Sequence, residues 1–380
     1  MKIIIAPDSF KGSLSSVEVC NAIEKGIKNA FPQADIVKLP VADGGEGTVE
    51  ALIASTNGHW ARQVVHDPLG QKIEAGYGIL GDGITAVIEM AAASGLPLVP
   101  PAKRNPLCTT TYGTGELIAA ALDRGCREFI IGIGGSATTD CGAGMAQALG
   151  VKFLTANGQE IKDLMNGGLM GKVAEIDLTN LRPEIQQSRF TVACDVTNPL
   201  LGPQGSAYVY APQKGATPEI VEELEKNMSV FIDILEATIG KSVRNIPGAG
   251  AAGGLGAGLL AFLEAQLKSG VEIVLEASHF SEKIRGADLI FTGEGKIDYQ
   301  TAFGKTISGV AREAKKQNIP VIAVGGAVDT DLDNLYDLGL TSFFSICNGP
   351  MTLDEAISKA SVLLEVLAER IVRAIRVNFV

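Results

Sequence analysis

One stretch of the chain, residues 132–144, combines glycines with hydroxyl side chains in the order Gly-Ile-Gly-Gly-Ser-Ala-Thr-Thr-Asp-Cys-Gly-Ala-Gly. Glycine lets backbone N–H groups approach an anion closely, and hydroxyls add hydrogen-bond donors. An apolar run precedes the stretch and a helix-forming run follows it, so we expect a buried strand, a loop and a helix N-terminus. Such a loop suits a phosphate, although a strand–turn–helix corner that uses glycine only for packing has the same composition. The candidate phosphate-binding residues are Gly134, Gly135, Ser136, Thr138 and Thr139.

Polar side chains also follow other expected strands. Asp8, Ser9 and Lys11 come after the apolar run 3–5, Asp43 follows the run 36–39, and Asp195 follows the run 190–194. In an open α/β sheet, ligands bind at the edge formed by the carboxyl ends of the strands. These residues are therefore candidates for binding or catalysis.

The elements that would position these loops alternate between strand and helix. A capping-box pattern at residues 15–18 predicts a helix that extends to about residue 31. Between residues 62 and 90, short runs joined by Pro-Leu-Gly and Gly-Asp-Gly turns are typical of antiparallel strands. We therefore predict an α/β protein with a doubly wound parallel-sheet domain built from both chain ends, residues 1–58 and 285–380. A second α/β domain, residues 59–284, is inserted between them, and the cleft between the two domains is the expected active site.

Composition narrows the class of protein. A chain of 380 residues is long enough for two domains, and 45 glycines with 5% aromatic residues favour an α/β fold with many tight turns. A net charge of −11 without a basic run argues against nucleic acid as a partner. The six scattered cysteines form no C-x-x-C pair and indicate reduced thiols of a cytoplasmic protein. Glycines and a proline interrupt the uncharged segment 245–263, so we expect no membrane span.

The common nucleotide signatures do not apply here. Residues 304–306 and 240–242 end like a P-loop but lack its first glycine. Residues 248–253 match G-x-G-x-x-G, yet the residues before them make a poor strand, which favours a closely packed glycine-rich helix entry over a dinucleotide site.

Five motifs, taken in order, resemble those of the bacterial glycerate kinase family, and the resemblance extends from residue 2 to about residue 364. The motifs are Asp8-Ser9-Phe10-Lys11-Gly12-Ser13, Ala42-Asp43-Gly44-Gly45-Glu46-Gly47-Thr48, Gly134-Gly135-Ser136-Ala137-Thr138 with Asp140, Cys194-Asp195-Val196-Thr197-Asn198-Pro199-Leu200 and Thr292-Gly293-Glu294-Gly295-Lys296-Ile297-Asp298. The chain departs from the family pattern at Cys141, where a second glycine is expected and where a Cβ atom disfavours positive φ.

The resemblance implies a two-domain kinase that uses ATP and Mg²⁺ to phosphorylate D-glycerate by in-line transfer, with 2-phosphoglycerate as the product. Such a transfer needs positioned phosphates, a bridging metal, cations and a carboxylate that accepts the hydroxyl proton. The expected catalytic residues are Asp195, Asp43 and Lys11, and the two aspartates share the roles of base and magnesium ligand without an assignment. The expected substrate-binding residues are Asp8, Ser9, Lys11 and Lys296, and Gly293, Glu294 and Gly295 are further phosphate-binding candidates.

The sequence leaves two other functions open. An NAD(P)-dependent hydroxy-acid dehydrogenase would rest on residues 248–253 alone. A regulator that binds glycerate or nucleotide without turnover would tolerate the loss of acidic residues at strand ends, whereas Asp8, Asp43, Asp195 and Asp298 are all present. The expected partner is a small molecule, with no nucleic acid and no membrane, and a homo-oligomer is compatible with the sequence.

Overall fold

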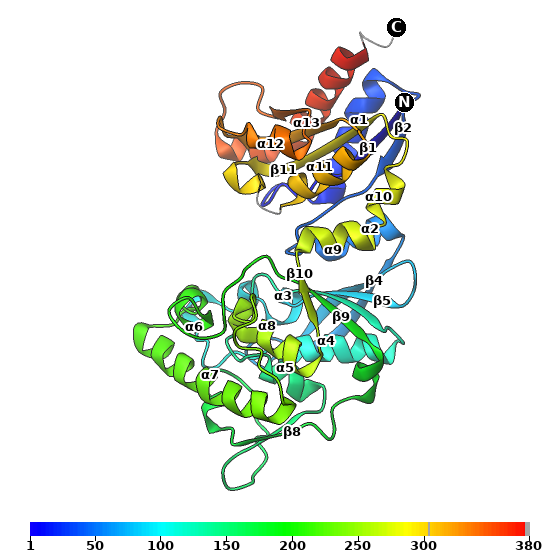
Figure 1. Cartoon of the computed structure of the whole chain (residues 1–380). Coiled ribbons are helices and arrows are strands. Elements are labelled where there is room, and N and C mark those ends of the chain that lie inside the picture. The colour runs from blue at the N-terminus through cyan, green and yellow to red at the C-terminus, as the bar shows by residue number, and fades with distance from the viewer. Residues whose placement is uncertain (303–304, 377–380) are drawn as a thin grey trace. The chain divides into compact units, whose positions relative to one another are not determined.

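The structure is a computed structural model that describes residues 1–302 and 305–376, and the chain divides into two compact units (Figure 1). The first unit consists of Met1–Asp43, Glu50–Gly58 and the chain from Ser269 onward. The second unit consists of Gly44–Val49 and His59–Lys268. Both ends of the chain therefore build one unit, and the segment between them forms most of the other.

The first unit contains a parallel sheet of five strands in the order β13-β12-β11-β1-β2. Ile3 and Ile5 pack in one hydrophobic cluster with residues of helices α1 (Ser16–Ala30) and α13 (Leu353–Arg376), and Ile4 between them points to the opposite face. All three side chains are fully buried, so both faces of the sheet are covered, as a doubly wound fold requires. The strands are β1 (Lys2–Ile5), β2 (Asp35–Lys38), β11 (Leu289–Ile297), β12 (Val321–Val328) and β13 (Ser342–Ser345).

The helices of the first unit pack closely on one another. The predicted capping box opens α1, because Ser15 accepts from the backbone of Glu18 while the Glu18 carboxylate accepts from the backbone of Ser15. A Cβ atom on Gly26 would lie 2.1 Å from the backbone oxygen of Glu365, so glycine permits the close contact between α1 and α13. The helices are α1 (Ser16–Ala30), α2 (Thr48–Thr56), α9 (Gly270–Ala277), α10 (Phe280–Lys283), α11 (Thr306–Lys316), α12 (Asn334–Leu338) and α13 (Leu353–Arg376), with a 3₁₀ turn at Tyr299–Ala302.

The chain returns to the first unit earlier than the expected boundary at residue 285. Helices α9 and α10 group with the first unit, and a Cβ atom on Gly309 in α11 would lie 2.6 Å from the Val271 side chain in α9. The buried apolar face of α9 therefore packs on α11, a contact that the sequence pattern around residue 270 did not reveal.

The second unit contains a mixed sheet of six strands in the order β10-β9-β6-β5-β4-β3. The expected antiparallel strands are present as β3, β4 and β5, because β4 pairs antiparallel with both of its neighbours, and the sheet then continues from β5 through the parallel strands β6, β9 and β10. The strands are β3 (His59–His66), β4 (Lys72–Ile79), β5 (Thr85–Glu89), β6 (Glu128–Gly132), β9 (Arg189–Ala193) and β10 (Gln266–Lys268), and β7 (Lys152–Leu154) and β8 (Glu175–Asp177) form a separate antiparallel pair.

The helices of the second unit surround one large hydrophobic core. They are α3 (Ala91–Ser94), α4 (Tyr112–Asp123), α5 (Ala143–Ala148), α6 (Ser206–Tyr210), α7 (Pro218–Ile239) and α8 (Ala251–Phe262), with 3₁₀ turns at Leu96–Leu98, Pro101–Lys103, Met170–Lys172, Pro183–Gln187 and Pro212–Lys214. Across residues 1–302 and 305–376, no helix combines the length and apolar character needed to cross a membrane.

Candidate functional site

The strand order of the first unit has one topological switch point, which lies between β1 and β11. From β1 the chain adds β2 on one side, whereas β11, β12 and β13 follow one another on the other side. Open parallel sheets bind ligands at the carboxyl edge of such a point, because the loops there leave in opposite directions and open a crevice. Asp8 lies at this edge, where its N–H donates to the backbone oxygen of Gly293 at 2.8 Å.

Two carboxyl groups at the switch point have strongly raised pKa values. Burial raises the pKa of Asp8 to about 6, and the charge of Asp43 acts in the same direction, although hydrogen bonds from Thr306 (2.5 Å) and from the backbone of Ser9 (2.6 Å) oppose the shift. Burial likewise raises the pKa of Glu294 to about 7, while Thr301 donates its hydroxyl to this carboxyl group. Carboxyl groups that titrate near neutral pH at a strand edge are typical of functional sites.

The segment that contains Gly293, Glu294, Gly295 and Lys296 is part of a strand, not the expected loop. Strand β11 continues to Ile297 and stays paired with β12 over that length. Gly293 is needed because a Cβ atom there would lie 2.4 Å from the backbone oxygen of Val324. The backbone of this segment is thus paired with β12, and a role for its glycines in phosphate binding stays a prediction.

The two predicted lysines of this unit have different surroundings. Lys11 is exposed in the turn after β1, and a Cβ atom on Gly295 would lie 3.3 Å from its backbone nitrogen, so this turn lies beside β11. Lys296 is also exposed, but its ammonium lies 3.4 Å from the Asp298 carboxylate and 3.3 Å from that of Asp329. An exposed ion pair of this kind contributes little to stability, and a substrate carboxylate would have to compete with both partners.

In the second unit, sheet register brings Asp195 and the glycine-rich loop to the same edge. Gly132 at the end of β6 pairs with Ala193 at the end of the parallel strand β9. The glycine-rich loop starts one residue beyond Gly132, and Asp195, which is exposed, lies two residues beyond Ala193. The register therefore places a carboxylate next to the candidate phosphate loop.

The predicted phosphate-binding residues divide into an exposed tip and a buried base. Gly134 and Gly135 are exposed, and Ser136 is 9% exposed. Thr138 and Thr139 are fully buried, and their hydroxyl oxygens find no hydrogen-bond partner within residues 1–302 and 305–376. The two threonines thus form the base of the loop, and direct contact of their hydroxyls with a phosphate would require the loop to open.

The helix N-terminus behind this loop is already occupied by a carboxylate. Asp140 is fully buried and accepts hydrogen bonds from the N–H groups of Gly142 (3.1 Å) and Gly144 (3.3 Å) at the start of α5. It also accepts from the backbone and the hydroxyl of Thr111, both at 2.8 Å. The expected attraction between a phosphate and this N-terminus is therefore reduced, because the N–H groups there already donate to the Asp140 carboxylate.

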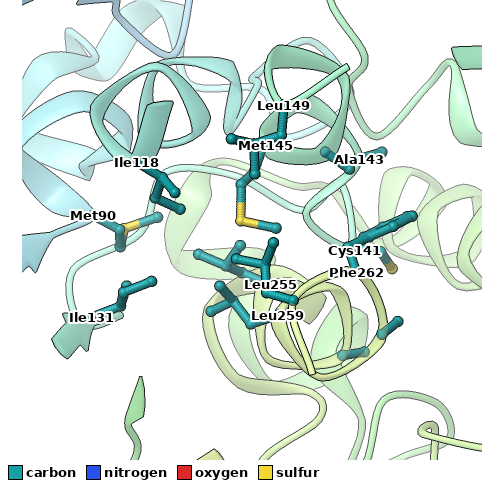
Figure 2. Packing of buried hydrophobic residues seen from close by; sticks show 14 of the residues in the cluster. Met90, Ile118, Ile131, Cys141, Ala143, Met145, Leu149, Leu255, Leu259 and Phe262 are labelled. Carbon is teal, nitrogen blue, oxygen red and sulfur yellow. The ribbon is translucent and has the colours of Figure 1, made fainter. Parts of the chain in front are cut away.

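Cys141 adopts the conformation that a glycine would have in its place. Its φ is 52°, and the next residue, Gly142, has φ of 71°. The side chain of Cys141 belongs to the core of the second unit, where Met145 reaches from α5 toward Leu255 and Leu259 of α8 (Figure 2). Burial in this core compensates for a strained backbone, so the departure from the family pattern leaves the left-handed turn intact.

The chain is similar to known proteins over almost its whole length. The model of the glycerate kinase family matches residues 3–376. The chain belongs to the glycerate kinase family. It is 53% identical to a glycerate kinase of Bacillus subtilis, with 99% of this chain and 98% of the relative covered, and 52% identical to a glycerate 2-kinase of Escherichia coli, with 94% and 93% covered. A crystal structure of a protein proposed to be glycerate kinase 2 from Salmonella typhimurium LT2 superposes with a TM-score of 0.91 at 46% identity, covering 100% of this chain and 99% of the other.

Membership of the glycerate kinase family leaves no place for the dehydrogenase alternative. In the described structure, the G-x-G-x-x-G segment lies after helix α7 and extends into the start of α8, and helices α6 and α7 separate it from the preceding strand β9, so it does not directly follow a strand. A Cβ atom on Gly253 would lie 1.9 Å from the carbonyl oxygen of Thr138, so this segment packs against the base of the candidate phosphate loop. Close packing thus explains its glycines.

Several residues at the two sites were not singled out from the sequence. Thr306 and Thr301 donate to the Asp8 and Glu294 carboxyl groups, and the charge of Lys305 lowers the pKa of Glu294. Lys305 and Thr306 belong to the rejected P-loop-like triplet, whose Gly304 lies outside the described residues. Lys214, whose ammonium donates to the carbonyl oxygen of Thr138, was missed because it stands in no motif; it is the last residue of the 3₁₀ turn Pro212–Lys214.

The raised pKa of Glu294 predicts a measurable effect on stability. In the unfolded chain this carboxyl group titrates near 4.5, so between about pH 4.5 and pH 7 the folded chain holds the proton more tightly. Stability from this group is therefore present at low pH and is lost as pH rises toward 7. Glu294→Gln removes the ionisation and is expected to stabilise the first unit by about 2–3 kcal/mol at pH 8, with little change at pH 4.5.

Thermal and urea unfolding of both proteins at the two pH values measure this difference. Glu272→Gln, an exposed glutamate in the first turn of α9, is the matched control and should shift stability by less than about 0.5 kcal/mol at either pH. Equal destabilisation by Glu294→Gln at both pH values would show that the carboxyl group stabilises the fold instead.

Proposed function

We propose that the chain is an ATP-dependent kinase that transfers a phosphoryl group to D-glycerate and forms 2-phospho-D-glycerate by in-line displacement. Family membership over residues 3–376 is the observation that carries this proposal. The choice of the 2-hydroxyl is supported by the Escherichia coli relative, which is named a glycerate 2-kinase.

The proposed roles follow the strand edges of the two units. The loop 134–139 holds phosphate groups, and Asp195, which leaves the neighbouring strand at the same edge, acts as proton acceptor or metal ligand together with Asp43. Asp8, Ser9 and Lys11 bind the glycerate at the switch point of the first sheet, where Lys11 attracts its carboxylate.

The acidic residues suit magnesium as the cation. Carboxylate oxygens are the ligands that Mg²⁺ prefers, and it commonly uses one or two of them together with substrate phosphates and water. Asp43 is exposed and its charge raises the pKa of Asp8, so a cation near this pair would relieve the repulsion. Within the described residues, no group of three or more His, Cys, Asp or Glu side chains could hold a metal ion by itself, so the proposed Mg²⁺ would need phosphate oxygens or water as further ligands. When bound, Mg²⁺ would neutralise phosphate charge.

One coupled assay tests the proposal. Purified protein is supplied with D-glycerate, ATP and Mg²⁺, and release of ADP and formation of phosphoglycerate are measured. Direct consumption of the product by enolase without a mutase identifies the 2-phosphate. A folded protein that forms no phosphoglycerate contradicts the proposal, and dependence on an added mutase overturns the choice of hydroxyl.

We further propose a cytoplasmic location for the enzyme. All six cysteines are free, and Cys20, Cys126 and Cys141 are buried. Unpaired thiols persist in reducing compartments, whereas secreted domains commonly pair them.

A further inference from the structure

Lys214 is a buried lysine that has no role in the reaction proposed above. It is the last residue of the 3₁₀ turn Pro212–Lys214, its side chain is 1% exposed, and its ammonium donates to the carbonyl oxygen of Thr138 at 2.6 Å. Burial lowers the pKa of Lys214 to about 7, and the charge of Asp140 opposes that shift. Burying an ammonium group costs desolvation free energy, so a buried lysine at this carbonyl is expected to have a structural or functional role.

Lys214 is one of several groups that hold the loop carbonyls toward the protein interior. The backbone N–H of Leu96 donates to the carbonyl of Gly135 at 2.8 Å, and the Thr109 hydroxyl donates to the carbonyl of Ala137 at 2.9 Å. Lys214 holds the next carbonyl, that of Thr138. Because the C=O and N–H of a trans peptide point in opposite directions, the N–H groups of the residues that follow are turned away from these anchors.

Three of these N–H groups have no protein partner among the described residues, although those of Thr138 and Thr139 belong to fully buried residues and become accessible to a ligand only when the loop opens. In the part of the chain that the structure describes, the N–H groups of Ser136, Thr138 and Thr139 donate to no protein acceptor, and the hydroxyls of both threonines are unpartnered as well. The N–H of Ala137, which lies between them, donates instead to the carbonyl oxygen of Ser94 at 3.0 Å, so the anion-binding concavity that such N–H groups can form would use Ser136, Thr138 and Thr139 only. The unpartnered buried hydroxyls are a second and independent sign that something polar completes this loop.

The loop has no positive charge of its own. Residues 129–149 contain no lysine or arginine, and Asp140 places a carboxylate at the N-terminus of α5. A phosphate at the exposed tip, Gly134 and Gly135, would therefore meet a site with a net negative charge unless a cation lies behind it. Lys214 supplies that cation from another part of the chain.

We propose that Lys214 is a positioning residue of the phosphate loop: its ammonium holds the Thr138 carbonyl inward and supplies the positive charge that favours a nucleotide phosphate on the other side. This inference rests on the proposed kinase function and adds a residue to it. Lys214 touches neither phosphate nor substrate, and it acts through the loop.

The Lys214→Met variant tests the inference, because methionine keeps the length and removes the charge. We expect its KM for ATP to rise about tenfold or more, since a charged hydrogen bond and its field are lost, while the KM for glycerate stays within about twofold. Lys214→Arg keeps the charge and should restore most of the affinity. Lys241→Met, an exposed lysine in the same unit, is the matched control and should behave as the wild type.

The pH dependence of the KM for ATP distinguishes a positioning role of Lys214 from a merely structural one. Arginine stays protonated, whereas Lys214 loses its proton as pH rises above about 7, with Asp140 the charged group that faces it. From pH 6 to pH 8.5, the KM for ATP of the wild type should therefore rise relative to that of Lys214→Arg, and the titration of ATP itself cancels in the ratio. ATP binding should also take up protons at pH 8 in the wild type, which calorimetry in buffers of different ionisation enthalpy measures without any variant.

Three results would overturn the inference: ATP affinity of Lys214→Met within twofold of the wild type, one pH profile shared by wild type and Lys214→Arg, or no proton uptake. Calorimetric binding of ATP also keeps the two proposals apart. A wild type that binds ATP but forms no phosphoglycerate contradicts the kinase proposal, and the effect of Lys214 on that binding still decides the inference.

Discussion

The Asp195→Asn variant should keep its fold and lose about 10²–10⁴-fold in kcat, the range typical of a removed general base. Asp195 leaves β9 at the edge where the phosphate loop leaves β6, as the pairing of Ala193 with Gly132 requires. Asparagine has the same shape but neither accepts a proton nor binds a metal as a carboxylate does. Both candidate roles of Asp195 therefore predict a large loss of turnover.

Steady-state kinetics at several Mg²⁺ concentrations distinguish the two roles. A loss that added Mg²⁺ partly restores indicates a metal ligand, whereas a loss that is independent of Mg²⁺ indicates the base. Asp163→Asn changes another exposed aspartate of the second unit and is expected to retain full activity. A drop in kcat of less than about threefold for Asp195→Asn would remove this residue from the catalytic role.

The Gly253→Ala variant is expected to show the largest effect on the phosphate loop. Gly253 has φ of 75°, and an added Cβ atom would lie 1.9 Å from the carbonyl oxygen of Thr138 and 2.7 Å from the Cα atom of Thr139. Both contacts are with backbone, so the loop or α8 has to move. We expect a loss of about 3–5 kcal/mol in stability of the second unit and a large rise in the KM for ATP, because the Thr138 carbonyl that Lys214 holds would be displaced.

Gly83→Ala provides the control that isolates the clash. Gly83 has φ of 74°, and a Cβ atom there would meet nothing within 4 Å. It therefore shares the cost of placing alanine in the left-handed region, about 1–2 kcal/mol, and lacks the contact with the loop. We expect thermal unfolding and ATP kinetics to show a larger loss for Gly253→Ala than for Gly83→Ala. The same loss in both variants would mean that backbone strain alone accounts for the effect.

The fold class could be predicted from local sequence patterns because each pattern has a local physical cause. The apolar run at residues 3–5 is a strand buried on both faces, and the capping box at Ser15 and Glu18 opens α1 as expected. The segment 292–298 was expected to be a loop, since glycines and charged residues are rare in strands. Pairing with β12 overrides that preference, because Gly293 allows the close approach of Val324.

The sequence by itself determined the family, the α/β class and the positions of Asp8, Asp43 and Asp195 after strands, because these depend on neighbours along the chain. Only the tertiary structure decided which side chains from distant parts of the chain come into contact. It buried Thr138 and Thr139, placed the Asp140 carboxylate at the N-terminus of α5, raised the pKa values of Asp8 and Glu294, and brought Lys214 against the candidate phosphate loop. Burial and long-range electrostatics depend on residues distant in sequence, and no local spacing encodes them.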